Sequence, residues 1–209
     1  MKFQEDFKKE LLALPVKEKD RLLLRLLKKD LDLANKLYYE LLDDTSVEEY
    51  RDQLEQHIKN RITFHTAKFW SPGYLMMELR DLSGEITNHV KIRKDKFGEI
   101  YLNLIMLTET LQQNMENLKK ATASKRKKFD IYVIARCFKI LLLVKKLHED
   151  YLLDFEELLI SLGNSLGKDD SLMKAAIYHG FNVNWLIQLE IPDDIADIHK
   201  DLRARGYLK

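Results

Sequence analysis

The chain has 209 residues, of which 45% are hydrophobic and 33% are charged, with only seven glycines and three prolines. This composition is too apolar for a disordered chain and too poor in turn residues for a β-sandwich or a β-barrel. The formal net charge is +1, so the overall charge favours neither nucleic acid, nor a membrane, nor an acidic substrate as a partner.

Helical periodicity dominates the N-terminal region. Residues 2–14 and 16–29 each repeat apolar residues every three or four positions, and Pro15 separates the two runs. Charges every two or three residues in the first run exclude a signal peptide and predict the first helix of the domain. Asp30 is placed to cap a third helix over residues 31–42.

Residues 12–42, LALPVKEKDRLLLRLLKKDLDLANKLYYELL, form a predicted helix pair of plausible repeat length. This segment resembles the helical repeats of HEAT and armadillo proteins. The resemblance implies helix pairs that stack and expose a surface for a partner. It covers about a sixth of the chain, and no second clear copy follows.

Two N-terminal helix signals follow in the chain. Thr45 and Glu48 have the capping-box spacing and predict the start of a longer helix that reaches Phe69. Ser71 and Pro72 predict the N-cap and the first residue of the next helix. The connections are short, so we expect consecutive helices to pack as antiparallel neighbours.

The region 86–104 is compatible with two structures. The segments ITNHVKIR and EIYLNL alternate in polarity, which predicts a β-hairpin around KDKFG. Apolar residues also recur every three or four positions from Phe97 to Leu118, which predicts a helix. We favour the helix, because its apolar seam persists for about three heptads whereas the alternation is brief.

Residues 129–147 predict a helix that is apolar on two faces. At ~100° per residue, Ile134 and Phe138 lie on one side, and Cys137 and Ile140 lie on the other. Such a helix is typically sandwiched between layers. It is too short to span a bilayer.

The elements together predict an all-α fold of eight to ten helices in antiparallel pairs, as a short α-solenoid or two stacked helical bundles. Residues 1–120 are expected to form an N-terminal helical layer. Residues 121–209 are expected to form a C-terminal helical layer around the central helix 129–147, and the two layers to form one compact unit. Gly206 is expected just beyond the last helix, which begins at Pro192.

The five residues from Gly163 read GNSLG and match the G-x-S-x-G pattern of serine hydrolases, with Asp193 and His199 following in triad order. A nucleophile elbow needs a buried strand before the serine. The preceding DFEELLISL is an amphipathic helix instead. We therefore predict that Gly163 ends a helix, that residues 164–170 form a loop, and that Ser165 is not a nucleophile.

The histidines lack the spacing of metal ligands. His65 lies on an apolar stripe and is predicted to be a buried, hydrogen-bonded core residue. Glu85 and His89 are predicted to form an i,i+4 helix pair. Residues 148–150 (His-Glu-Asp) point ~100° apart on a helix and do not converge on one ligand. Cys137 is expected to be an inert thiol with a raised pKa.

The run from residue 119 to 128, KKATASKRKK, is polar and basic and predicts a boundary between two apolar helices. Its cations are Lys119, Lys120, Lys125, Arg126, Lys127 and Lys128. They form a possible interaction patch that could hold the phosphates of RNA or DNA. A solvated loop at the end of a helix explains them as well, and the lack of an aromatic residue in the run favours this second interpretation.

The sequence favours a non-catalytic protein–protein interaction scaffold with a protein partner of unknown identity. No catalytic, cofactor-binding or metal-binding residue is expected. The alternative is a nucleic-acid-binding module that uses residues 119–128, and a third option is an enzyme whose site is not readable from residue spacing. The single cysteine fits a reducing cytoplasm, and no membrane partner is expected.

Overall fold

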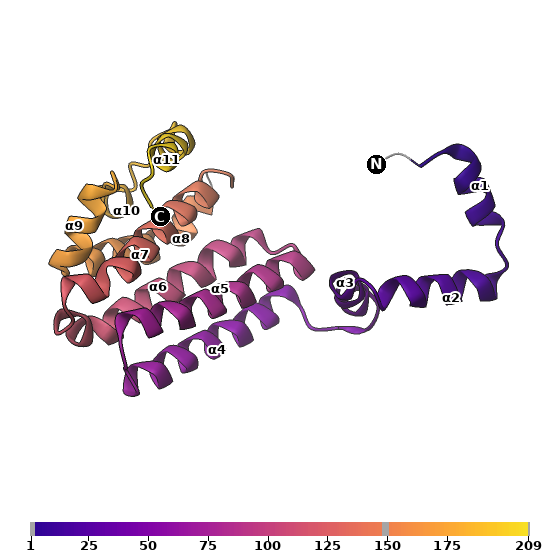
Figure 1. Ribbon diagram of the computed structural model, residues 1–209, viewed down its shortest axis with the longest axis horizontal. Helices are drawn as coiled ribbons and strands as arrows, with labels where there is room; N and C mark the ends of the chain where they lie inside the picture. Colours follow the sequence, from indigo (N-terminus) through magenta and orange to yellow (C-terminus); the bar gives the residue numbers. More distant parts are fainter. Residues whose placement is uncertain (1–2, 148–150, 209) are drawn as a thin grey trace. The chain divides into compact units, whose positions relative to one another are not determined.

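A computed structural model describes residues 3–147 and 151–208 of the chain (Figure 1). The described residues form eleven α-helices and no strand, which confirms the all-α prediction. The number exceeds the expected eight to ten, and one of the eleven, α10 (Asn184–Ile187), is a single turn. The chain divides into two compact units, Met1–Thr45 and Ser46–Lys209.

The first unit contains α1 (Glu5–Ala13), α2 (Val16–Leu27) and α3 (Leu31–Leu42). Pro15 separates the first two helices as predicted, and the Asp30 side chain accepts a backbone N–H of α3 as its N-cap. None of these three helices contains a buried residue. The first unit therefore has helices but no hydrophobic core of its own.

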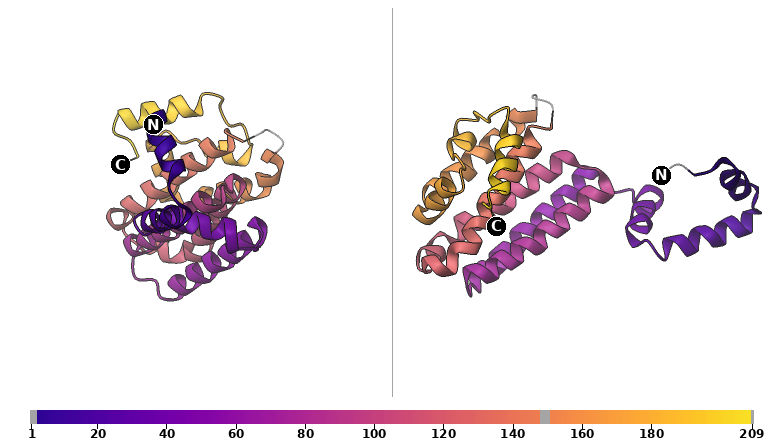
Figure 2. Two further views of the ribbon diagram at one scale, coloured as in Figure 1. Left: turned by 90° about the vertical axis from the view of Figure 1, so that its right-hand side faces the viewer. Right: turned by 45° about the horizontal axis from the view of Figure 1, so that its top comes forward.

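The second unit holds the core of the chain. Its longer helices are α4 (Val47–Ala67), α5 (Pro72–Arg93), α6 (Lys96–Lys119), α7 (Ala123–Val144) and α8 (Leu152–Gly167), followed by α9 (Asp170–Tyr178), α10 and α11 (Ile195–Ala204). Packing extends beyond consecutive pairs. Helices α4, α6, α8 and α10 pack in that order as one layer, and α5, α7 and α9 as a second (Figures 1 and 2).

The predicted boundary after residue 120 falls inside the second unit. Only residues 120–122 separate α6 from α7, and these two helices pack on each other. The layers are therefore made of alternate helices and not of the halves 1–120 and 121–209. The compact unit begins instead at Ser46.

Local capping signals place the starts of α4 and α5 within one residue, whereas α11 begins at Ile195, three residues after the predicted Pro192. The capping box of α4 uses Ser46 and Glu49, one residue later than predicted. Ser71 caps α5, with Pro72 in its first turn, as predicted. The region 86–104 is helical on both sides of a short turn, so the helix prediction is confirmed and the hairpin is excluded.

The predicted loop over residues 164–170 is wrong, because α8 continues to Gly167 and Asp169 already caps α9. Gly163 does not end a helix. A Cβ there would meet Ile187 Cγ1 at 2.6 Å, so the glycine permits close approach of α10. A glycine is needed at this position because α8 and α10 pack closely together, and not because the chain turns there.

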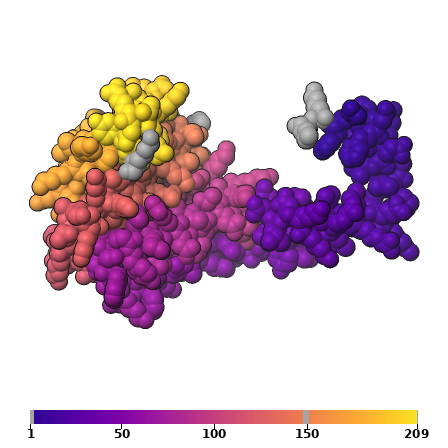
Figure 3. All heavy atoms as spheres, viewed as in Figure 1, coloured from indigo at the N-terminus to yellow at the C-terminus, as the bar shows by residue number. Residues whose placement is uncertain are grey.

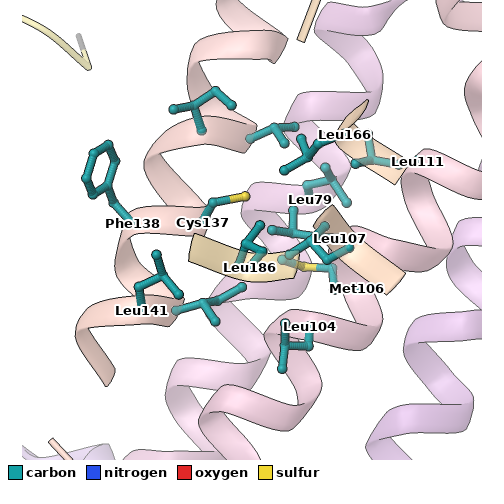
Figure 4. Close-up of a cluster of buried hydrophobic side chains, with 14 of the residues drawn as sticks. Leu79, Leu104, Met106, Leu107, Leu111, Cys137, Phe138, Leu141, Leu166 and Leu186 are labelled. Atoms are coloured by element: carbon teal, nitrogen blue, oxygen red, sulfur yellow. The ribbon is translucent and has the colours of Figure 1, made fainter. Parts of the chain in front are cut away.

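Helix α7 is buried on both faces, as predicted for the central helix 129–147, although it begins at Ala123 and ends at Val144. Cys137 points toward Leu107 and Leu186, whereas Phe138 points to the other side of the helix (Figure 4). The Phe138 ring lies 5.0 Å from the ring of Phe181, between centroids. Burial raises the pKa of the Cys137 thiol well above its ordinary value, as expected.

We predict that Phe138→Ala and Ile140→Ala each destabilise the protein by about 2–5 kcal/mol, because each truncation leaves a cavity on a different buried face of α7. Ile177→Ala, at an exposed position, is the matched control and should change stability by less than about 0.5 kcal/mol. Denaturant unfolding measures all three. A loss below about 1 kcal/mol at Phe138 or Ile140 would contradict burial of that face.

A buried ion cluster fixes the turn between α5 and α6. Arg51 of α4 donates to Asp95 through Nε (2.8 Å) and Nη2 (3.0 Å), and His89 Nε2 lies 2.9 Å from Asp95 Oδ2. Asp95 also caps α6 by accepting the N–H of Gly98. Burial opposes ionisation, but these hydrogen bonds outweigh it and lower the pKa of Asp95 from 3.8 to about 2.

We predict that Asp95 stabilises the fold by about 2 kcal/mol at neutral pH. Its folded pKa is depressed, so this contribution is present above pH ~4 and is lost as the pH falls toward ~2. Urea unfolding of wild type and Asp95→Asn across this window measures it. The stability difference between the two proteins should shrink as the pH falls, and a difference independent of pH would contradict the assignment.

Candidate functional site

The structure places the basic run in two helices and not in a loop. Lys119 ends α6, Lys120 follows it, and the other four cations occupy the first two turns of α7. The exposed cations there are Lys125, Lys127 and Lys128. Arg126 is buried, with 3% of its surface exposed. The six cations therefore do not form one solvated patch, and Arg126 is not part of an exposed surface.

Arg126 holds two buried carboxylates. Its Nη2 donates to Asp169 Oδ1 (2.8 Å) and to Asp130 Oδ1 (3.2 Å). Ser171 Oγ donates to the second oxygen of Asp130 (2.6 Å). Burial raises the pKa of Asp130, against the effect of its hydrogen bonds. Because Asp169 is the N-cap of α9, this cluster ties the start of α7 to the start of α9.

A cavity of about 930 Å³ lies beside this cluster. It is bounded by the start of α7, by α9 and by the chain that follows α11, which are coral, orange and yellow in Figure 3. The lining residues that matter chemically are Lys127, Lys174, Tyr178, His179, Arg205 and Tyr207. Only the first of these belongs to the basic run.

Local geometry brings the remaining lining residues together. Lys174 and Tyr178 lie one turn apart on α9. Gly206, with a φ of 89°, ends α11, and the N–H of Tyr207 donates to Leu202 O (3.0 Å) in the pattern of a Schellman motif. This turn places the Tyr207 ring centroid 5.6 Å from that of Tyr178.

The sequence prediction missed five of these six residues. The spacing of Lys174 and Tyr178 indicates that they share a helix face, but nothing in the sequence indicates that this face adjoins Lys127. That proximity depends on the buried contact between Arg126 and Asp169, 43 positions apart.

The serine of the GNSLG motif does not lie in a nucleophile elbow. Ser165 is buried in α8, and its hydroxyl donates to the backbone carbonyl of Ser161 (2.9 Å). No strand precedes it in the described chain, so no strand-to-helix turn lifts the hydroxyl above a sheet.

Two predictions about histidines can be compared with the structure. The Glu85–His89 pair is wrong, because Glu85 pairs with His57 (3.0 Å) and Arg61 (2.9 Å) of α4, and His89 pairs with Asp95. His65 Nε2 lies 2.9 Å from a carboxylate oxygen of Glu78, and the side chain is half-buried and not fully buried. Residues 148–150 lie outside the described residues.

Two kinds of site are absent from the described residues. No group of three His, Cys, Asp or Glu side chains in residues 3–147 and 151–208 lies close enough together to hold a metal ion. No helix in the part of the chain that the structure describes is long and apolar enough to cross a bilayer.

Comparisons of the chain with models of known families, with curated proteins and with solved structures find no match. The resemblance of residues 12–42 to HEAT and armadillo repeats therefore stays a prediction.

We predict that Arg126→Met destabilises the protein by about 3–5 kcal/mol, because it leaves the buried Asp130 and Asp169 without their cation. Lys125→Met, one residue earlier and exposed, is the matched control and should change stability by less than about 0.5 kcal/mol. Chemical denaturation compares them. Equal stability of the two variants would contradict the buried position of Arg126.

Proposed function

We propose that the protein is a non-catalytic interaction scaffold whose first unit binds a protein partner. The observation that carries this proposal is the exposure of apolar side chains on helices without a core. The large apolar side chains exposed in this unit are Phe3, Phe7, Leu11, Leu12, Val16, Leu23, Leu24, Leu26, Leu31, Leu33, Tyr38, Leu41 and Leu42. Exposed apolar patches of this kind mark interaction surfaces.

Helix length supports the need for a partner. The three helices have 9, 12 and 12 residues. Isolated helices shorter than about 12–15 residues are marginal in water, and helices in proteins draw most of their stability from packing of an apolar face. A partner that covers these faces would supply the packing that the first unit does not supply itself.

The charge pattern favours a protein over a lipid surface. Residues 16–29 carry six basic and two acidic side chains, whereas residues 30–44 carry one basic and five acidic side chains. An anionic membrane attracts the first segment and repels the second. A protein surface with charges of both signs can complement both segments and thereby fix one orientation.

The second unit offers an aromatic surface that suits the same role. Trp70, at the turn between α4 and α5, is 84% exposed. Phe64 and Tyr74 are exposed beside it around a cavity of about 340 Å³. Trp and Tyr are enriched among the residues that dominate binding energy at interfaces. The proposal includes a cytoplasmic location, which the single buried cysteine supports.

We predict that the triple variant Leu23→Glu, Leu24→Glu, Leu26→Glu of the full chain loses its protein partner, because the charges disrupt the apolar face of α2. The matched control places three glutamates at exposed apolar positions of the second unit, Met77, Leu153 and Ile177. Affinity purification from native cells with quantitative mass spectrometry compares the proteins that each form retains.

A partner retained in stoichiometric amount by wild type and control, and reduced at least about tenfold in the α2 variant, is the expected result. Recovery of the same proteins with the α2 variant would contradict the proposal. Binding of wild type to phosphatidylserine vesicles that is lost in the α2 variant would assign the surface to lipid and would contradict it as well.

A further inference from the structure

The cavity beside α7 and α9 presents cations to whatever enters it. Lys127, Lys174 and Arg205 come from three separate segments, and Arg205 also pairs with Asp201 on its own helix. Asp130 is the one acid among the lining residues, and the buried cluster already uses both of its oxygens. The charges that face the cavity therefore select an anion.

His179 adds a neutral hydrogen-bond donor. The residue is 6% exposed, and its Nδ1 accepts the backbone N–H of Leu208 (3.2 Å). Burial, assisted by the positive charge of Lys127, lowers the pKa of His179, so the ring is neutral at pH 7. Because Nδ1 accepts, the proton of the neutral ring is on Nε2, which is a donor.

Aromatic rings stand next to these donors. Tyr178 is 69% exposed, and its ring packs edge to face against Tyr207 and His179. The rings are thereby held by their neighbours while Tyr178 keeps most of its surface open. An exposed aromatic ring beside cations is the combination that binds a base together with its phosphate.

The start of α7 has an electrostatic imbalance that an anion would relieve. Four basic side chains and no acidic side chain before Asp130 occupy its first two turns, at the positive end of the helix dipole. The N-cap, Thr122, makes no side-chain hydrogen bond to the helix. Ala123 and Ser124, in the first turn, line the same cavity.

We propose that this cavity binds a nucleotide unit, with the phosphate against Lys127, Lys174 and Arg205 and the base stacked on Tyr178. Its volume, about 930 Å³, lies within the range of small-molecule sites, ~300–1,000 Å³. An inorganic anion would use the cations but not the tyrosine. A free mononucleotide and a nucleotide within a single strand of RNA or DNA both supply this chemistry.

Calorimetric titration of the full chain tests the proposal with ATP, AMP, tripolyphosphate and a short single-stranded oligouridine. We expect ATP and AMP to bind, with tripolyphosphate weaker than ATP. Lys127→Glu with Lys174→Glu should lower the affinity at least about tenfold, through charge repulsion at exposed positions that leaves the fold intact. Lys9→Glu with Lys17→Glu makes the same change of net charge in the first unit and should have no effect.

A second variant isolates the stacking. Tyr178→Ala should lower the affinity for AMP about tenfold and leave that for tripolyphosphate unchanged. Tighter binding of AMP than of oligouridine identifies a free nucleotide as the ligand, and the reverse order identifies a strand. Absence of binding by every probe, equal binding of tripolyphosphate and ATP, or unchanged binding by the Lys127/Lys174 variant would overturn the proposal.

Discussion

Burial of α7 on both faces is the constraint on which the second unit depends. A helix that is apolar on two faces is typically packed between other helices. Four helices pack on α7: α5, α6, α9 and α11. Phe138 and Ile140, on different faces of α7, are both fully buried. The candidate site lies at the N-terminal end of the same helix, where residues of its first turns line the cavity.

Helical geometry explains why one run of like charges has two roles. Adjacent residues on a helix point ~100° apart, so Arg126 enters the core while Lys125 and Lys127 stay in solvent. The buried guanidinium neutralises the carboxylates of Asp130 and Asp169, and because Asp169 caps α9, this contact fixes the cavity wall. The first unit has no comparable anchor, since α1, α2 and α3 bury no residue. Its apolar side chains are instead exposed.

Helix ends that depend on neighbouring residues were predictable from the sequence. Contacts between residues far apart in the chain were not. Asp30, Pro72 and Gly206 act through their own backbone geometry, so their positions predicted helix ends correctly. Gly163 suggested a helix end, but the approach of α10, which the sequence does not reveal, gives that glycine a packing role. Glu85 and His89 have ideal spacing, yet each finds a partner beyond its own helix. The cavity could not be predicted either, because its walls come from three segments that are far apart in the sequence.

Hydrogen–deuterium exchange of the isolated full chain tests most directly the claim that the first unit has no hydrophobic core of its own. Amides in α6 and α7 should exchange only through global unfolding, because these helices are packed on several sides. Amides over residues 5–42 should exchange orders of magnitude faster, as expected of short helices without tertiary packing. Protection of residues 5–42 equal to that of α7, in the purified protein alone, would contradict the account.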